Sequence, residues 1–227
     1  MNFDFPFMVR SFPRILTGLP TTLLITVISM LIGLILGFFV ALCRLHKIPA
    51  LSQICAVYVS FIRGTPLIVQ LYLVFYTLPR LISLWSKDGN LVVLSPLVVA
   101  LICFSFNTAA YLSRAIGGAL ASVSFSQVEA ALSVGETYWQ GLFRIVLPQA
   151  LVTAFPTLTN CLLNLLKGTS LAFTVMVVDL MARAKIVAAE GYRYIESYLV
   201  CAIIFWILCF CVNRLCRWWG SKLQGAT

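Results

Sequence analysis

The chain has 227 residues, of which 61% are hydrophobic and only 10% are charged. About one quarter of the residues in a soluble domain are charged, so this composition excludes a soluble domain and predicts an integral membrane protein. The formal net charge is +9, but the basic residues lie at the ends of apolar runs, which is typical of topology determinants and does not indicate a nucleic-acid surface.

The cysteine and histidine content predicts no metal site. The eight cysteines lie in or at the ends of apolar runs, and the chain has one histidine. A zinc site needs spaced pairs of such ligands, so we interpret the cysteines as small apolar fillers. No cluster of His, Asp and Ser at a membrane interface indicates a lipid-modifying enzyme, and we expect no catalytic residues.

The first 43 residues predict a membrane anchor and one span. Residues 1–18 mix phenylalanine with charge and proline, which favours a segment at headgroup depth. The following apolar run, 19–43, would make a helix of about 36 Å, long enough to cross the hydrocarbon layer. Gly33 and Gly37 within it are spaced for close packing against another helix. Arg44 and Lys47 end the run and indicate a cytoplasmic end.

The next apolar stretch, 51–84, is interrupted by Arg63-Gly64-Thr65-Pro66. An arginine at membrane depth is costly unless it is paired or lines a wet cavity, and a proline removes a backbone donor. We expect one broken helix that does not face lipid. The alternative is a short cytoplasmic loop between two spans, but the two halves are short for that.

Two further spans and a last short one are expected downstream. They cover 91–112, 148–166 and about 197–212. In the third span Asn107 and Thr108 are polar, and a hydrogen bond to a neighbouring helix is the commoner role for such an asparagine. The fourth span breaks at 167–170, which is tolerated only where protein or water covers the backbone. The charged stretch 182–197 is expected to be an aqueous connection.

A moderately polar segment, 122–148, separates the third and fourth spans and is called the coupling hairpin below. Ser126 followed three residues later by Glu129 is a capping-box pattern, which predicts a short helix over about 127–134. Gly135 stands where a left-handed C-terminal cap is needed, and Pro148 suits the first turn of the next helix. By itself this pattern describes an exposed connecting loop.

The motif Glu-Ala-Ala, three residues, Gly, nine residues, Ile-x-Leu-Pro resembles the coupling loop of bacterial ABC-importer permeases. Arg63-Gly64-Thr65-Pro66 resembles a tetrapeptide in the amino-acid subgroup of that family. The resemblance extends from the first span to Leu215. It implies a type I ABC-importer fold: an all-α polytopic membrane protein with about five transmembrane helices and a cytoplasmic coupling-helix loop.

The resemblance also implies a set of partners. These are an ATPase dimer, a second permease subunit, an extracytoplasmic amino-acid-binding protein and membrane lipid, with no nucleic acid. The chain has no Gly-rich phosphate loop, so ATP and magnesium are expected on the ATPase and no cofactor on this chain. The implied ATPase interface comprises Ser126, Glu129, Ala130, Ala131 and Gly135.

The implied substrate site comprises Ser60, Arg63, Asn107, Thr108, Gly168 and Thr169. Family members that look built for cationic amino acids have acids where Ser60 and Gly168 stand. A cationic side chain without a counter-charge at the midplane would cost several kcal/mol, so we expect a neutral polar or zwitterionic ligand. Residues 181–185 and 191–199 look like the cystine-importing branch. A further departure is Arg114, where the family usually has Glu, with Gly117 where it usually has Arg; the arginine would then pair elsewhere in the complex or attract a substrate carboxylate.

The sequence therefore predicts the permease subunit of an importer for a polar amino acid, most closely L-cystine, working by alternating access in the bacterial cytoplasmic membrane. Alternatives are another neutral amino acid such as glutamine, or an ion-coupled secondary transporter. The expected organisation is an interfacial segment 1–18, a transmembrane domain 19–217 and a cytoplasmic tail 218–227. The N-terminus is expected outside, although Arg10, Arg14 and the basic 183–193 stretch then count as exceptions to the positive-inside rule.

Overall fold

The computed structural model describes residues 3–85, 94–124 and 126–224, which form helices and turns without a strand. The helices in chain order are α1 (Phe5–Leu16), α2 (Leu19–Leu45), α3 (Leu51–Gly64), α4 (Leu67–Trp85), α5 (Pro96–Ser122), α6 (Ser126–Ser133), α7 (Tyr138–Gly141), a π-helical turn (Leu142–Val146), α8 (Leu147–Gly168), a 3₁₀ helix (Thr169–Val175), α9 (Leu180–Gly191) and α10 (Tyr194–Gln224). The described residues confirm the all-α prediction.

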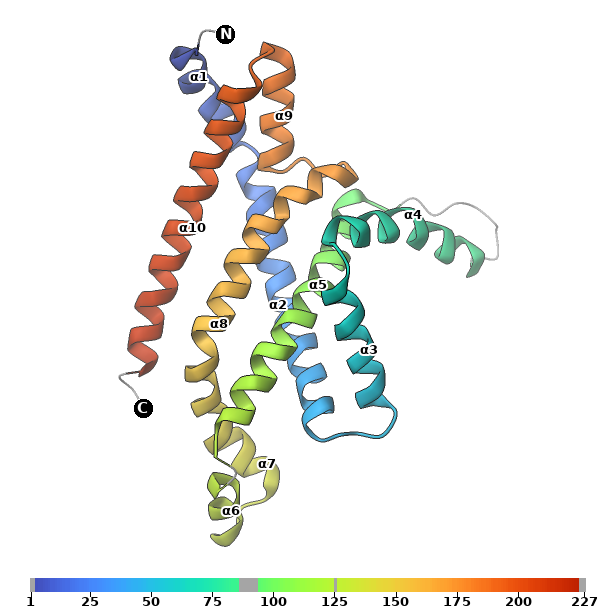
Figure 1. Ribbon diagram of the computed structural model, residues 1–227, viewed down its shortest axis with the longest axis vertical. Helices are drawn as coiled ribbons and strands as arrows, with labels where there is room; N and C mark the ends of the chain where they lie inside the picture. Colours follow the sequence, from blue (N-terminus) through green and yellow to red (C-terminus); the bar gives the residue numbers. More distant parts are fainter. Residues whose placement is uncertain (1–2, 86–93, 125, 225–227) are drawn as a thin grey trace.

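The long helices α2, α5, α8 and α10 run along the long axis of the molecule (Figure 1). Helices α1 and α9 lie at one end, together with the start of α10, and α6 and α7 lie at the other. Five helical stretches of the described chain are long and apolar enough to cross a membrane: Leu19–Leu45, Leu67–Leu84, Pro96–Ser122, Tyr138–Val175 and Tyr194–Leu223. The predicted number of spans is thus confirmed.

Helices α2 and α5 pack closely against each other along a contact that is called the α2–α5 seam below. A Cβ added to Gly33 would come within 2.9 Å of a Thr108 methyl group, and one added to Gly37 within 3.0 Å of the Ala109 carbonyl oxygen. The two glycines therefore let the α2 and α5 backbones approach closely, as their spacing predicts. The seam holds α5, and with it Asn107 and Thr108, at a fixed height relative to α2.

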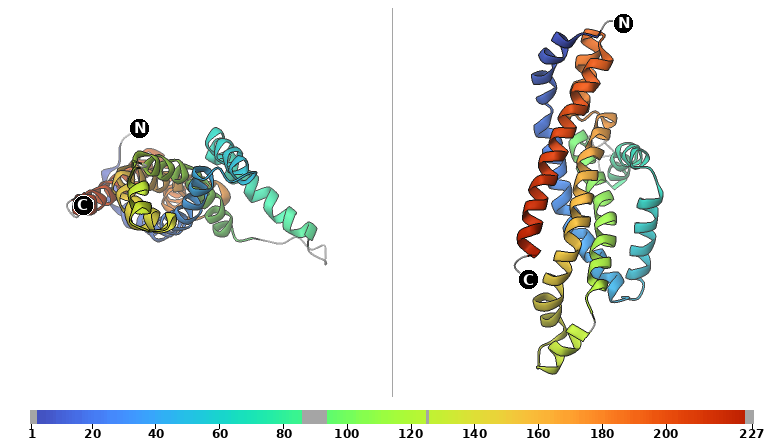
Figure 2. Two further views of the ribbon diagram at one scale, coloured as in Figure 1. Left: turned by 90° about the horizontal axis from the view of Figure 1, so that it is seen from below. Right: turned by 60° about the vertical axis from the view of Figure 1, so that its left-hand side comes forward.

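The chain turns sharply between α3 and α4. Helix α4 lies across the bundle axis and projects away from the other helices (Figures 1 and 2). Pro66 cannot donate to the Ile62 carbonyl, which would be its partner in a continuous helix. The Gln70 side chain takes over this bond, since its Nε2 donates to the Ile62 oxygen at 2.7 Å. This elbow confirms the predicted break in the 51–84 stretch and fixes its shape.

Several predicted boundaries are wrong because charged residues were taken as helix ends. Helix α5 continues past Arg114 to Ser122, and α10 runs to Gln224, so residues 218–224 continue the last helix. The last span is therefore long, not short. In addition, most of the 182–197 stretch, predicted as an aqueous connection, is the helix α9, whose Ala184, Val187 and Ala188 are buried while Arg183 and Glu190 face outward.

The N-terminal segment is a helix that packs onto the bundle. Pro6 occupies the first turn of α1, and the Asp4 carboxylate accepts a hydrogen bond of 2.9 Å from the Phe7 N–H at its N-terminus. Met8 and Ile15 belong to a cluster of buried residues with Leu180, Val187, Val200 and Ile204. Helix α1 therefore ties α9 and α10 together, in addition to exposing Phe5 and Phe12, which suit headgroup depth.

Candidate functional site

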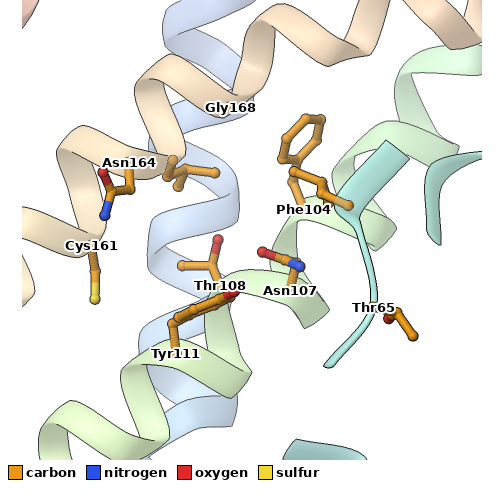
Figure 3. A pocket seen from close by; sticks show the side chains of 10 residues that line it. Thr65, Phe104, Asn107, Thr108, Tyr111, Cys161, Asn164 and Gly168 are labelled. Carbon is orange, nitrogen blue, oxygen red and sulfur yellow. The ribbon is translucent and has the colours of Figure 1, made fainter. Parts of the chain in front are cut away.

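A cavity of about 300 Å³ lies between the α3–α4 elbow, α5 and α8 (Figure 3). It is lined by Thr65, Leu67, Phe104, Asn107, Thr108, Tyr111, Cys161, Asn164, Leu165 and Gly168. This volume is at the small end of the range for ligand pockets, which suits a ligand of amino-acid size. The elbow, the α2–α5 seam and the end of α8 together position its walls.

The polar part of the lining consists of neutral groups. Asn107, Thr108 and Tyr111 project from α5, and Cys161 and Asn164 from α8 (Figure 3). Their amide, hydroxyl and thiol groups offer both hydrogen-bond donors and acceptors. No carboxylate is among the lining residues. The arrangement can hydrogen-bond a zwitterion, but it offers no counter-charge to a cationic side chain.

Three of the six predicted substrate contacts line this cavity, namely Asn107, Thr108 and Gly168. The other three do not. Ser60 is exposed on α3 outside the lining, and Thr169 is fully buried with its hydroxyl donating 2.8 Å to the Leu166 carbonyl. The Thr169 hydroxyl is therefore bonded to the backbone of its own helical segment and not to the cavity, because the chain passes from α8 into the 3₁₀ helix at this residue.

Arg63 lies beside the cavity rather than in its lining. Its guanidinium carbon is 5.4 Å from the centroid of the Tyr111 ring. A cation over an aromatic face is attracted by the negative face of the ring. Arg63 therefore supports Tyr111, which does line the cavity, and brings a positive charge close to it.

Sequence reasoning missed Gln70, which organises the elbow wall. Its Oε1 accepts a hydrogen bond of 2.9 Å from Asn107 Nδ2, and its Nε2 donates to Thr65 Oγ1 at 2.8 Å and to the Ile62 carbonyl at 2.7 Å. Gln70 is 4% exposed. The sequence does contain a signal for this residue. Because Pro66 has no N–H, the Ile62 carbonyl loses its helical partner and needs another donor within the next turn.

The coupling hairpin forms the opposite end of the molecule from α1 and α9 (Figure 1). Gly135 has φ +88, and its N–H bonds to the Leu132 carbonyl at 3.1 Å while the Glu136 N–H bonds to the Ala131 carbonyl at 3.1 Å. This pair of bonds is the Schellman motif at the end of α6, so the predicted left-handed cap is confirmed.

The predicted capping box at Ser126 is replaced by other caps. The Ser126 N–H donates to Ser124 Oγ at 3.4 Å, so the capping side chain lies two residues earlier than predicted. The capping box of the hairpin lies instead at Thr137 and Gln140, at the start of α7. Both pairs have the same spacing, so sequence alone could not decide between them.

The predicted interface residues of the hairpin divide into two groups. Ser126, Glu129, Ala130 and Gly135 are exposed and available to a partner. Ala131 is 2% exposed, and its Cβ lies 3.0 Å from the position that a Cβ on Gly141 would occupy. Ala131 therefore packs α6 onto the rest of the hairpin and does not face outward.

Exposed apolar side chains of the hairpin were missed. Val134 is 80% exposed, and Leu132 and Trp139 are exposed as well. Trp139 and Tyr138 each have their ring centroid 5.4 Å from that of His46, just beyond the end of α2. The hairpin is thus attached to α2 by ring contacts, while its apolar tip is uncovered.

Residues 33–224 match the family described as binding-protein-dependent transport system inner membrane component. A probable amino-acid permease protein, YxeN of Bacillus subtilis, is 42% identical over 205 residues, which are 90% of this chain and 89% of the relative. The L-cystine transport system permease protein TcyL of the same organism is 38% identical, covering 90% of this chain and 84% of the relative.

A solved amino acid ABC transporter chain, described as crystallised with histidines, is 28% identical with a TM-score of 0.85, covering 98% of this chain and 100% of that chain. A chain of the MetNI methionine ABC transporter has the same fold, with a TM-score of 0.75 at 20% identity. The chain belongs to the family of ABC-transporter permeases. It is an amino-acid permease with the type I importer fold, a translocation subunit and not an enzyme.

Proposed function

We propose that this permease subunit imports a neutral or zwitterionic polar amino acid, with L-cystine the preferred candidate, through the cavity between the elbow, α5 and α8. The observation that carries the proposal is the lining: amides, hydroxyls and a thiol, without a carboxylate. A cationic side chain would lose its hydration there without gaining a counter-charge. Two relatives described as L-cystine permeases, TcyL and TcyB, are each 38% identical to this chain.

The proposed mechanism is alternating access driven from outside the chain. An ATPase dimer that binds ATP and magnesium would contact the exposed face of the coupling hairpin, around Glu129 and Ala130. The hairpin would pass ATPase closure to α2 through His46 and to α8 through the continuous helical segment after Gly141. A second permease subunit and an extracytoplasmic binding protein complete the proposed complex. This function places the hairpin in the cytoplasm and the N-terminus outside.

The substrate proposal is tested on the purified complex by ligand-dependent thermal stabilisation across the twenty amino acids and cystine. We expect cystine to give the largest shift and lysine and arginine none. A shift by arginine that equals or exceeds that by cystine would contradict the proposal.

A charge variant makes the test sharper. A Cβ on Gly168 would make only ordinary contacts, at 3.7 Å with Leu67 and 3.9 Å with Phe104, so the position accepts a side chain. Gly168→Asp should move preference toward arginine in a competition assay, because it supplies the missing counter-charge. Gly168→Asn has nearly the same shape without the charge and is the matched control. The same shift in both variants would show that size and not charge sets the preference.

The coupling proposal is tested with Glu129→Lys. We expect ATP hydrolysis without uptake, with membrane insertion intact, because the substitution reverses a charge on the face that would meet the ATPase. Gln127→Lys adds a charge on the same helix, outside the implied contact set, and is the control. Normal uptake by the Glu129 variant would contradict the role of the hairpin. Failure of the complex to contain any ATPase would favour the ion-coupled alternative.

A further inference from the structure

A second polar cavity, of about 350 Å³, lies between the end of α2 and the C-terminal half of α5. It is lined by Ala41, Arg44, Leu45, Ser113, Arg114, Gly117 and Gly118. It shares no residue with the candidate substrate cavity. A Cβ placed on Gly117 or Gly118 would meet nothing within 4 Å, so these glycines leave open space beside the two arginines.

The charge in this cavity is uncompensated. Arg44 and Arg114 both line it, and no acid is among the lining residues. The ion pairs found among the described residues use Arg14, Arg144 and Arg193 instead. Two guanidinium groups that line one cavity repel each other, and an anion between them would relieve that repulsion.

The acids in the described parts of the chain are in the wrong place to supply that anion. Asp4 and Asp179 cap the starts of α1 and α9, and Glu190 and Glu196 lie on α9 and α10, toward the far end of the molecule (Figure 1). Glu136 is paired with Arg144 at 3.2 Å, within the coupling hairpin. Glu129 lies on α6, beyond the end of α5. A second copy in the same membrane orientation would present the same described acids at the same depths, so we expect none of these to reach the cavity.

We infer that Arg44 and Arg114 bind the phosphate of an anionic phospholipid headgroup at the membrane surface. Guanidinium groups match phosphate oxygens with paired hydrogen bonds, while the Ser113 hydroxyl in the cavity wall already donates to the Ala110 carbonyl at 2.9 Å. Gly117 and Gly118 allow the headgroup to approach the α5 backbone, while Ala41 and Leu45 offer apolar contact to the glycerol and the start of the acyl chains. Basic pockets between membrane helices are suited to such headgroups.

The leaflet depends on the proposed function, because the cytoplasmic assignment follows from the orientation of the coupling hairpin. The recognition of phosphate does not depend on it. The two arginines are on helices that meet at the α2–α5 seam, so an occupied cavity would also stabilise the end of α2 next to His46. The expected effect of the lipid is therefore higher stability of the bundle.

The test compares the purified complex in membranes of neutral phosphatidylcholine with membranes that also contain phosphatidylglycerol. We expect phosphatidylglycerol to raise the melting temperature of the wild-type complex. Arg44→Gln and Arg114→Gln should each abolish this rise, and the double variant should lose no more than either single variant, because both residues bind one ligand. Arg214→Gln, an exposed arginine on α10 outside the cavity, is the matched control and should keep the rise.

Three results would overturn the inference. The first is a full rise in both cavity variants, and the second is an equal loss in the Arg214 control, which would indicate general charge attraction to the membrane. The third is the same rise from inorganic phosphate in neutral membranes, which would assign the site to a soluble anion rather than to lipid. The Glu129 experiment is independent: its failure would remove the leaflet assignment and leave the lipid-dependent rise in place.

Discussion

At the end of the molecule formed by α1, α9 and the start of α10, each carboxyl group has a hydrogen-bond or ion-pair partner within the chain, whereas at the coupling-hairpin end two arginines share a cavity without an acid. At the first end Arg193 is 3.4 Å from the Glu196 carboxylate and 3.8 Å from that of Asp4. Arg14 pairs with Glu190 across α1 and α9. Asp179, fully buried, accepts a hydrogen bond of 2.9 Å from the Ala182 N–H at the start of α9, although burial raises the pKa of its carboxyl.

The hairpin end has the opposite character. Val134 and Trp139 are exposed apolar side chains at the tip, and Arg44 and Arg114 share a cavity without an acid. Exposed apolar groups of this kind mark sites of interaction. The difference teaches that the charged groups of the first end serve mainly to hold its helices together, while those of the second end are open to a partner. Substitutions at the first end should therefore change stability, and substitutions at the second should change coupling.

The largest expected effect is that of Gly18→Ala, at the end formed by α1, α9 and the start of α10. A Cβ on Gly18 would lie 2.5 Å from the Asp179 backbone, which cannot move aside as a flexible side chain would. We expect a loss of about 3 kcal/mol in stability, as for a severely overpacked core. The measurement is the melting temperature and the monodisperse fraction of the purified protein. Gly64→Ala, where a Cβ meets nothing within 4 Å, is the control, and equal losses in both would contradict the close contact.

Gln70→Leu, between the two ends, should cost about 2 kcal/mol, because it leaves the Ile62 carbonyl and the Asn107 amide without a partner. Since Asn107 lines the cavity, amino-acid binding should weaken as well. Both are measured by thermal unfolding with and without ligand. Gln149→Leu is the matched control, because Gln149 also bonds to a carbonyl, that of Ile145 at 3.1 Å, but on the exposed side of α8. Unchanged ligand binding in the Gln70 variant would show that the elbow does not position Asn107 for amino-acid binding.

Much of the fold followed from spacing in the sequence, because the features concerned are local. The Gly33 and Gly37 pair predicted close packing of α2 against another helix, which the structure shows to be α5, and Gly135 predicted the left-handed cap of α6. Both depend only on residues within one helical turn and on the absence of a Cβ. The break at Pro66 was predicted for the same reason, since a proline removes a helical hydrogen bond wherever it stands.

The errors arose where a charge was taken to mean the end of a helix. In 182–197 the charged residues occupy one face of α9 while Ala184 and Ala188 occupy the other, so a helical period was present but was counted as general polarity. Arg114 was likewise taken as a helix end. The cavity was found only in part, because which of Ser60, Thr169 or Gln70 faces it depends on the rotation of each helix in the bundle, which no local pattern fixes.

For Gly135→Ala, at the coupling-hairpin end, we expect a smaller effect on stability and a larger effect on the coupling of ATP hydrolysis to uptake. With φ +88 and no neighbour within 4 Å of a Cβ, the substitution meets backbone strain alone, worth about 1 kcal/mol. Uptake should fall while the bundle keeps its melting temperature, since the strain is confined to the hairpin. Gly135→Asn, which tolerates the left-handed region better, should fall less. A drop in melting temperature as large as that of Gly18→Ala would remove the distinction between the two ends.

The smallest effect is expected for Arg14→Gln. The pair with Glu190 is about half exposed, with side chains 54% and 53% accessible, so water and salt screen it. Exposed pairs of this kind are worth about 0.5 kcal/mol, against about 3 kcal/mol for the Gly18 contact next to the same helix. Thermal unfolding at low and high salt measures the contribution, and the difference between Arg14→Gln and wild type should disappear at high salt. A salt-independent loss of more than about 1 kcal/mol would contradict this account, because it would mean that the Arg14 side chain contributes by packing and not through a screened ion pair.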